Sequence, residues 1–138
     1  MITQKYNVLV VDDFEPVRRW IFHSLDRLGV IAQFVEVDTA TRALAVLAEN
    51  TVDIIYLDIR LPDMSGIDLL RKIRESNKTS IIIMLTNYAY DQYRLHCQRI
   101  GAQAFLDKAI DLDKVGSTLE TLISQPTAQP GFTAAPAS

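Results

Sequence analysis

The apolar residues of this chain gather in short runs, and four of these runs end on a chemically reactive side chain. The runs are rich in valine and isoleucine, are too short for buried helices and lack polar alternation, which is typical of strands covered on both faces. A fifth run, residues 33–37, is weaker and more polar, and it predicts a strand at an edge of the sheet. The other four predicted strands cover residues 7–11, 53–57, 80–85 and 104–107.

Helical periodicity fills the segments between the predicted strands. Apolar residues three and four positions apart mark the inward stripe of each helix, and Trp20 belongs to the first stripe, so we expect it in the core. Asp38 or Thr39 is expected to cap the second helix. Ser65 stands at capping-box spacing from Asp68 at the start of the third. The predicted helices follow residues 17–28, 40–47, 67–73, 90–100 and 111–123.

Strand and helix alternate five times, and this order predicts the fold class. Because crossovers between parallel strands are right-handed, we expect an α/β fold with a doubly wound, five-stranded parallel sheet in the order 2-1-3-4-5, a flavodoxin-like three-layer sandwich. The predicted domain spans residues 1–124. Residues 125–138 are small, polar and proline-containing, and they predict a disordered tail or a truncated linker.

Composition excludes several classes of protein. With 138 residues, 49% of them hydrophobic, the chain suits one domain with its own core and needs no disulfide or structural metal. A single cysteine, Cys97, excludes an intramolecular disulfide and fits a reducing, cytoplasmic setting. No stretch approaches the roughly 18 apolar residues that cross a membrane. The net charge of −3 comes without a basic run, so this segment is not expected to bind nucleic acid.

The residues that follow the four apolar runs predict a metal site. Asp12 and Asp13 follow the first run and Asp58 the second, and all three are expected at one edge of the sheet. Two carboxylates about 4 Å apart repel by roughly 4 kcal/mol at an effective dielectric constant near 20, so three of them need a counter-charge. Mg²⁺, which prefers oxygen ligands, supplies it. We assign Asp13 and Asp58 as direct ligands, and Asp12 as a ligand through water or an orienting residue.

Asp58 has a second predicted role, since a carboxylate can attack phosphorus and form an acyl phosphate. Lys108, together with the metal, would neutralise charge on the phosphoryl oxygens. Thr86 would donate its hydroxyl to one of these oxygens. The added charge of about −1.5 to −2 would draw Thr86 inward and open a space for the Phe105 ring, which gives the two-state element that a switch requires.

Taken in order, these motifs resemble the receiver domains of bacterial two-component response regulators, which share the fold of the chemotaxis receiver protein. The resemblance covers residues 6 to about 124. It implies that Asp58 accepts phosphoryl from a sensor histidine kinase or a histidine phosphotransfer protein. The motifs are Val-Val-Asp-Asp at 10–13, Leu-Asp-Ile-Arg-Leu-Pro-Asp-Met-Ser-Gly at 57–66, Leu-Thr-Asn at 85–87 and Phe-Leu-Asp-Lys at 105–108.

The resemblance also implies roles for the remaining site residues. Asp12 and Asp13 serve the Mg²⁺ and the backbone carbonyl of Arg60 completes its site, while Lys108 contacts the phosphate. Thr86 and Phe105 form the switch pair. A signalling module of this kind catalyses its own phosphorylation and slow dephosphorylation and is not a metabolic enzyme. Its output face would be the fourth helix, the fifth strand and the fifth helix, directed at an effector protein or domain or at a second copy in a phosphorylation-dependent homodimer.

Three positions depart from the family pattern or vary within it. Ala109 stands where receivers usually carry proline after the lysine, and we expect a trans peptide there. Arg60 and Tyr88 occupy positions that tune phosphoryl lifetime in the family. Tyr88 also begins an aromatic cluster with Tyr90 and Tyr93, for which a protein interface and a solvated helix both remain open.

Two other functions fit parts of the pattern. A pseudo-receiver, which has the same fold and binds partners without phosphoryl chemistry, is compatible with Ala109. An aspartyl-phosphate phosphohydrolase would carry a DxD motif after the first strand, whereas here Asp12-Asp13 leads to Phe14-Glu15, and the chain has no cap domain.

Overall fold

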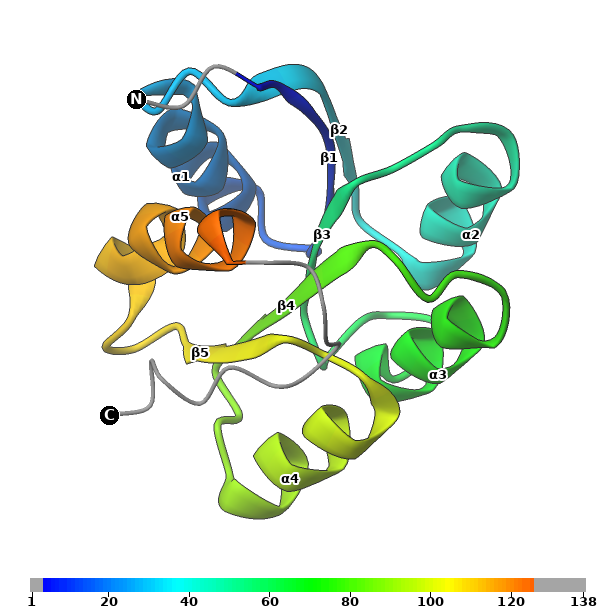
Figure 1. The fold of residues 1–138 in the computed structure, drawn as a ribbon. Helices are drawn as coiled ribbons and strands as arrows, with labels where there is room; N and C mark the ends of the chain where they lie inside the picture. Colours follow the sequence, from blue (N-terminus) through cyan, green and yellow to red (C-terminus); the bar gives the residue numbers. More distant parts are fainter. Residues whose placement is uncertain (1–3, 126–138) are drawn as a thin grey trace.

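Five parallel strands form the centre of the molecule. The computed structural model describes residues 4–125, and the predicted tail lies, apart from Gln125, outside this range. The sheet has the order β2-β1-β3-β4-β5, which confirms the predicted fold class (Figure 1). The edge position of β2 is confirmed as well. The strands are β1 (Tyr6–Val11), β2 (Ile31–Val37), β3 (Ile54–Leu57), β4 (Ile81–Thr86) and β5 (Ala104–Asp107).

Helices cover both faces of the sheet and make a three-layer sandwich (Figure 1). The alternation of strand side chains divides the interior into two cores: Val8 and Val10 of β1 pack with α1 and α5, while Leu9 and Val11 pack with α2, α3 and α4. None of the helices in the described range is long and apolar enough to cross a membrane. The helices are α1 (Glu15–Asp26), α2 (Ala40–Glu49), α3 (Gly66–Ser76), α4 (Asp91–Ile100) and α5 (Val115–Ser124), the last preceded by the 3₁₀ turn η1 (Leu112–Lys114).

The helix starts agree with the sequence in part. Thr39, and not Asp38, caps α2, since its hydroxyl accepts a hydrogen bond from the amide of Arg42 at 3.1 Å. Ser65 caps α3 by accepting from a main-chain amide, as predicted. The carboxylate of Asp68 pairs with the next turn of its own helix instead of completing a capping box.

The predicted burial of Trp20 is wrong. Its side chain is 45% exposed, and the buried stripe of α1 consists of Val17, Ile21 and Leu25. These three residues are spaced by four, and Trp20 lies beside them at the border with solvent. The indole Nε1–H donates to the carbonyl of Leu112 at 2.9 Å, so the ring spans from α1 to η1.

Candidate functional site

Three carboxylates meet at the carboxyl edge of the sheet. β1 and β3 are neighbours with Val11 opposite Leu57, so Asp12 and Asp58 follow adjacent strand ends. Asp12, Asp13 and Asp58 each offer an oxygen within 4.8 Å of the others. Asp12 and Asp58 are buried, whereas Asp13 is exposed.

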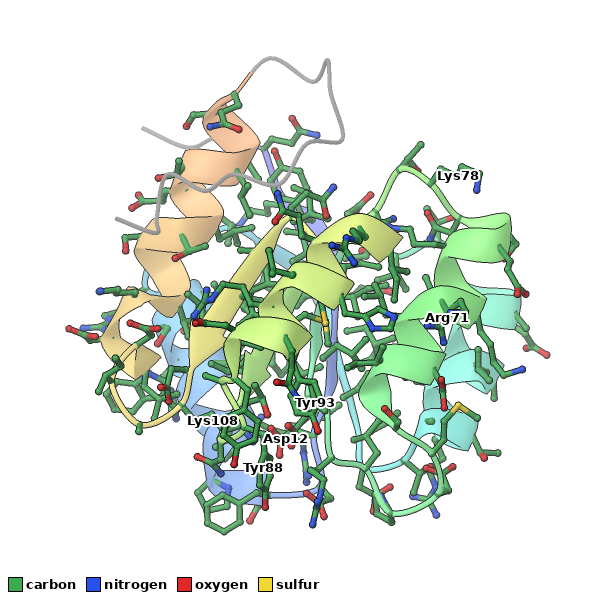
Figure 2. The ribbon with its side chains drawn as sticks, turned by 90° about the horizontal axis from the view of Figure 1, so that it is seen from below. Asp12, Arg71, Lys78, Tyr88, Tyr93 and Lys108 are labelled. Atoms are coloured by element: carbon green, nitrogen blue, oxygen red, sulfur yellow. The ribbon has the colours of Figure 1, made fainter. Side chains whose placement is uncertain are left out.

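Lys108 joins two of these carboxylates. Its Nζ lies 2.6 Å from Oδ2 of Asp12 and 3.0 Å from Oδ2 of Asp58, and all three side chains are buried. Figure 2 shows Lys108 and Asp12 at the same end of the molecule. The main-chain amide of Lys108 donates to the carbonyl of Thr86 at 2.9 Å and so continues the pairing of β5 with β4. The peptide before Ala109 is trans, as expected, and Lys108 reaches both carboxylates from this loop.

The charges of the site do not balance. Burial raises the pKa of Asp58 and nearby Asp12 adds to the rise, although Lys108 opposes it. Burial acts to lower the pKa of Lys108, but hydrogen bonds and charge from Asp12 and Asp58 outweigh it and raise that pKa, so the ammonium stays charged. Three carboxylates stand against one ammonium, an excess of two acidic groups. Oxygen ligands with this excess fit a divalent cation such as Mg²⁺.

The loop after Asp58 packs so closely that one position requires glycine. A Cβ at Gly66 would overlap the main-chain carbonyl of Asp58. The Gly66 amide donates to the carbonyl of Ile59 at 2.6 Å, and Arg60 forms an antiparallel bridge with Ser65. The amide of Arg60 approaches Oδ1 of Asp58 at 3.4 Å. The loop thus returns on itself beside the acidic cluster.

Asp63, to which the sequence assigned no role of its own, ties this loop to α2. Its carboxylate accepts hydrogen bonds from the amides of Ala40 and Thr41 at 2.9 and 2.8 Å and from the Thr41 hydroxyl at 2.6 Å. The Thr41 hydroxyl, with the two amides, lowers the pKa of Asp63 to about 2. Because the partners are more than 20 residues away in sequence, no local pattern could have revealed them.

The proposed switch residues share a core. Phe105 is opposite Met84 in the β4–β5 register, and Thr86 lies two residues further on, so both side chains face the α2–α4 side of the sheet. Both are buried. The Thr86 hydroxyl accepts from the amide of Tyr88 at 3.0 Å. Arg94 of α4 places its guanidinium 4.7 Å from the centre of the Phe105 ring and donates to the Phe105 carbonyl at 3.0 Å.

Aromatic side chains gather beside the site. The guanidinium of Arg60 lies 4.7 Å from the centre of the Tyr88 ring. Tyr90 is 6.4 Å from Tyr88 and 5.5 Å from Tyr93 between ring centres, so the predicted tyrosines do form one cluster. Figure 2 shows Tyr88 and Tyr93 at the same end of the molecule as Asp12 and Lys108.

A histidine and the single cysteine have structural contacts. His96 contacts Arg71 across α3 and α4, with 2.9 Å between Nε2 and Nη2. Cys97 is buried, and burial raises the pKa of its thiol to about 12, which keeps it protonated and unreactive.

Residues 8–120 match the family described as the response regulator receiver domain. The chain belongs to this family. Over 112 residues it is 33% identical to the sensor histidine kinase RcsC of Escherichia coli, a match that covers 81% of the chain and 12% of RcsC. It is 31% identical to the transcriptional regulator NtrC of Proteus hauseri and 28% identical to the sensory transduction protein LytT of Enterococcus faecalis, covering 88% and 83% of the chain. These matches cover 25% of NtrC and 46% of LytT, so this receiver domain spans less than half of these relatives.

Solved structures show the same fold. A two-component response regulator of the LuxR family from Aurantimonas sp. superimposes with a TM-score of 0.80 at 25% identity, covering 91% of this chain and 90% of the other. The receiver domain of the Francisella response regulator 1452 gives a TM-score of 0.77 at 22% identity over 87% and 98% of the two chains.

Proposed function

We propose that this receiver domain accepts a phosphoryl group on Asp58, with Mg²⁺ held by Asp12, Asp13, Asp58 and the backbone carbonyl of Arg60. The observation that carries the proposal is the unbalanced charge around Asp58: its buried carboxylate shares one ammonium, that of Lys108, with Asp12, while Asp13 adds a third negative charge. A structural ion pair has no need of the surplus carboxylates, but a site for a divalent cation and a phosphoryl group does.

In the proposed reaction an oxygen of Asp58 attacks phosphorus of a phosphohistidine on a sensor histidine kinase or a phosphotransfer protein. The new P–O bond forms as the P–N bond breaks, and the electron pair leaves with the donor imidazole, which takes up a proton. Lys108 stabilises charge on the phosphoryl oxygens, and the Thr86 hydroxyl donates to one of them. Mg²⁺, when bound, supplies further charge neutralisation at the same oxygens.

The consequences for signalling belong to the same proposal. Added negative charge at Asp58 acts on Thr86 and, through the shared core, on Phe105. The output face would be α4, β5 and α5, and its partner an effector protein or domain or a second copy in a phosphorylation-dependent homodimer. We propose a cytoplasmic module that binds no nucleic acid through this segment.

Intact-mass spectrometry after incubation with acetyl phosphate and Mg²⁺ tests the proposal. We expect a single phosphoryl adduct on the wild type that requires Mg²⁺, because acetate leaves as the Asp58–phosphorus bond forms. Asp58→Asn should abolish the adduct. Asp63→Asn, a change of the same kind in the same loop, should keep it. An adduct of equal stoichiometry on Asp58→Asn would overturn the proposal.

One observation favours a second candidate, a phosphorylation-independent interaction module. Phe105 is buried, and Arg94 contacts both its ring and its carbonyl, so α4 holds the ring in place without any contact to Asp58. An output face set in this way would not depend on phosphoryl transfer. The same experiment separates the two candidates when a histidine kinase is added as a second donor, since a pseudo-receiver gives no adduct with either.

A further inference from the structure

Arg18 connects the acidic site to the edge strand, although it contacts no carboxylate of the site. It lies in the second turn of α1, and its Nη1 donates to the main-chain carbonyl of Asp12 at 2.7 Å. Its Nε lies 2.9 Å from Oε1 of Glu36 in β2. The Arg18 side chain is 17% exposed, so this contact is largely shielded from water.

The contacts of Arg18 complete the anchoring of Asp12. The Asp12 amide donates to the carbonyl of Val37 at 3.1 Å, and its Oδ1 accepts from the amide of Phe14 at 2.8 Å. Its Oδ2 pairs with Lys108. With Arg18 on the carbonyl, each hydrogen-bonding group of Asp12 has a partner, so its backbone has a single orientation.

Asp13 has no such anchors. Within residues 4–125 no hydrogen bond or ion pair holds its carboxylate, which is exposed. The Asp12 carbonyl and the Asp13 amide belong to one planar peptide group, however. By fixing that carbonyl, Arg18 fixes the plane from which the Asp13 side chain departs.

We infer that Arg18 is a positioning residue for the metal site, which aims the Asp13 carboxylate at the oxygens of Asp12 and Asp58. This inference rests on the proposed function. Glu36 holds the Arg18 guanidinium in place against the Asp12 carbonyl. Mutation of a residue that orients a metal ligand commonly lowers the affinity of the site for the metal.

The neighbouring Arg19 provides a matched control. It pairs with the other oxygen of Glu36 from the same helix, but its side chain is 42% exposed, and no contact in the described part of the chain joins it to Asp12. Arg18→Lys and Arg19→Lys both keep the positive charge, and both replace the guanidinium with a single ammonium group. Only Arg18→Lys removes a guanidinium that contacts both Glu36 and the Asp12 carbonyl.

The first measurement is the dissociation constant for Mg²⁺ alone, by isothermal titration calorimetry. We expect Arg18→Lys to weaken Mg²⁺ binding by about tenfold and Arg19→Lys to leave it unchanged. Glu36→Gln, which keeps Arg18 but weakens its anchor, should give a smaller loss and serves if Arg18→Lys folds poorly. Equal affinity in the wild type, Arg18→Lys and Glu36→Gln would overturn the inference alone, whereas a wild type that binds no Mg²⁺ would overturn the proposed function with it.

The Mg²⁺ dependence of labelling by acetyl phosphate separates positioning from a general structural role. For Arg18→Lys, the half-saturating Mg²⁺ concentration should rise by the same factor as the dissociation constant, while the maximal labelling rate returns to that of the wild type. A partly unfolded protein would lose maximal labelling without a shift in Mg²⁺ dependence, and that result would contradict a positioning role.

Discussion

Two buried cations occupy opposite edges of the sheet, and they differ in what surrounds them. Lys108, at the carboxyl edge, is 8% exposed and contacts two carboxylates. Arg74, at the amino edge, is 9% exposed and donates only to neutral oxygens in the described structure. The acceptors of Arg74 are the carbonyls of Asn77, Ser80 and Gly101 and the side-chain Oε1 of Gln103, at 2.8 to 3.1 Å.

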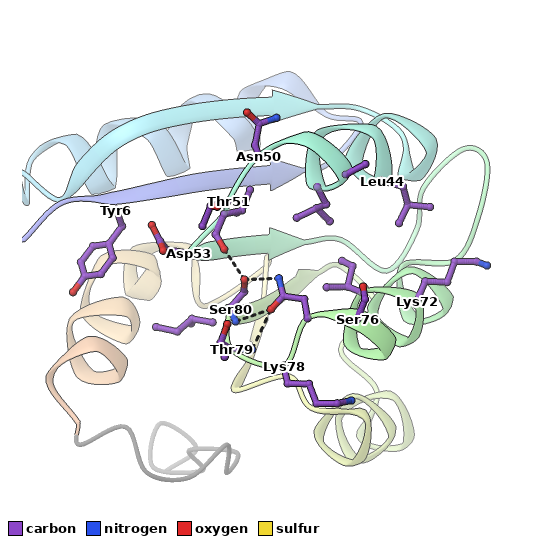
Figure 3. Close-up of a pocket in the computed structure, with 16 residues that line it drawn as sticks. Tyr6, Leu44, Asn50, Thr51, Asp53, Lys72, Ser76, Lys78, Thr79 and Ser80 are labelled. Atoms are coloured by element: carbon purple, nitrogen blue, oxygen red, sulfur yellow. Dashed lines mark hydrogen bonds between the residues drawn. The ribbon is translucent and has the colours of Figure 1, made fainter.

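The amino edge around Arg74 is a network of satisfied polar groups. The Asn77 side chain bonds the Ser80 hydroxyl and the amides of Thr79 and Ser80, and the Ser80 hydroxyl donates to the carbonyl of Val52 at 2.6 Å. A groove of about 780 Å³ opens beside this network, and Asn77, Thr79 and Ser80 help to line it (Figure 3). These hydrogen bonds connect the end of α3 with the loops that precede β3 and β4.

The difference shows that burial of a charge does not by itself mark a functional site. Each guanidinium nitrogen of Arg74 donates to at least one oxygen. Desolvation lowers the pKa of Arg74, and no carboxylate is among the causes that would oppose this change. At Lys108, one ammonium contacts two carboxylates, and Asp13 places a third carboxylate within 4.8 Å of them. A surplus of carboxylates, rather than burial of a charge, distinguishes the site from the structural network.

The largest effect should come from removing the cation at the carboxyl edge. Lys108→Met leaves Asp12 and Asp58 buried without their counter-charge, and we expect the free energy of unfolding at neutral pH to fall by about 3 kcal/mol in metal-free buffer. Mg²⁺ should restore part of the loss because it binds only the folded state. Urea denaturation with and without Mg²⁺ measures both effects, and a loss that Mg²⁺ does not reduce would contradict the account of the site.

Arg74→Met should have a somewhat smaller effect with no Mg²⁺ dependence. The change removes the donor of the buried Ser80 carbonyl and those of the partly buried Gly101 carbonyl, at a cost of about 2 kcal/mol in unfolding free energy. The same denaturation series provides the measurement. The folded variant should still form the acetyl phosphate adduct on Asp58, so a labelling defect in fully folded protein would show that the two edges are coupled.

The sequence predicted the carboxyl edge because its buried charged residues follow strands. Asp12, Asp58 and Lys108 each come directly after a buried apolar run, and a parallel sheet brings such positions together. Arg74 and Arg18 gave no signal, since each stands on a helix like an ordinary surface cation. Their acceptors are mainly carbonyls, which every residue possesses, so only the folded backbone reveals which ones they reach.

The prediction that Trp20 is buried was wrong for a related reason. Its spacing from Val17 matched the helical stripe, but a position beside the stripe is decided by what lies across from it. In this fold that neighbour is the η1 turn, whose Leu112 carbonyl accepts the indole N–H and keeps the ring at the surface. Local periodicity predicts which helix face is buried and leaves the border of that face undetermined.

The smallest effect concerns two aspartates of one loop whose pKa values move in opposite directions. Burial raises the pKa of Asp58, whereas hydrogen bonds lower that of Asp63 to about 2. A lowered pKa contributes stability above the ordinary aspartate value near 4, and this is lost as the pH falls through about 2. A raised pKa has the opposite sign: stability declines as the pH rises from about 4 through the raised value.

Thermal unfolding against pH in metal-free buffer therefore compares the two positions directly. We expect Asp63→Asn to be less stable than the wild type at neutral pH, with a deficit that shrinks from pH 4 toward pH 2. Asp58→Asn should be more stable at neutral pH, because the asparagine carries no charge to bury, and its advantage should shrink as the pH falls toward 4. If both variants shifted stability with the same sign, the opposition between a desolvated carboxylate and a hydrogen-bonded one in this loop would be wrong.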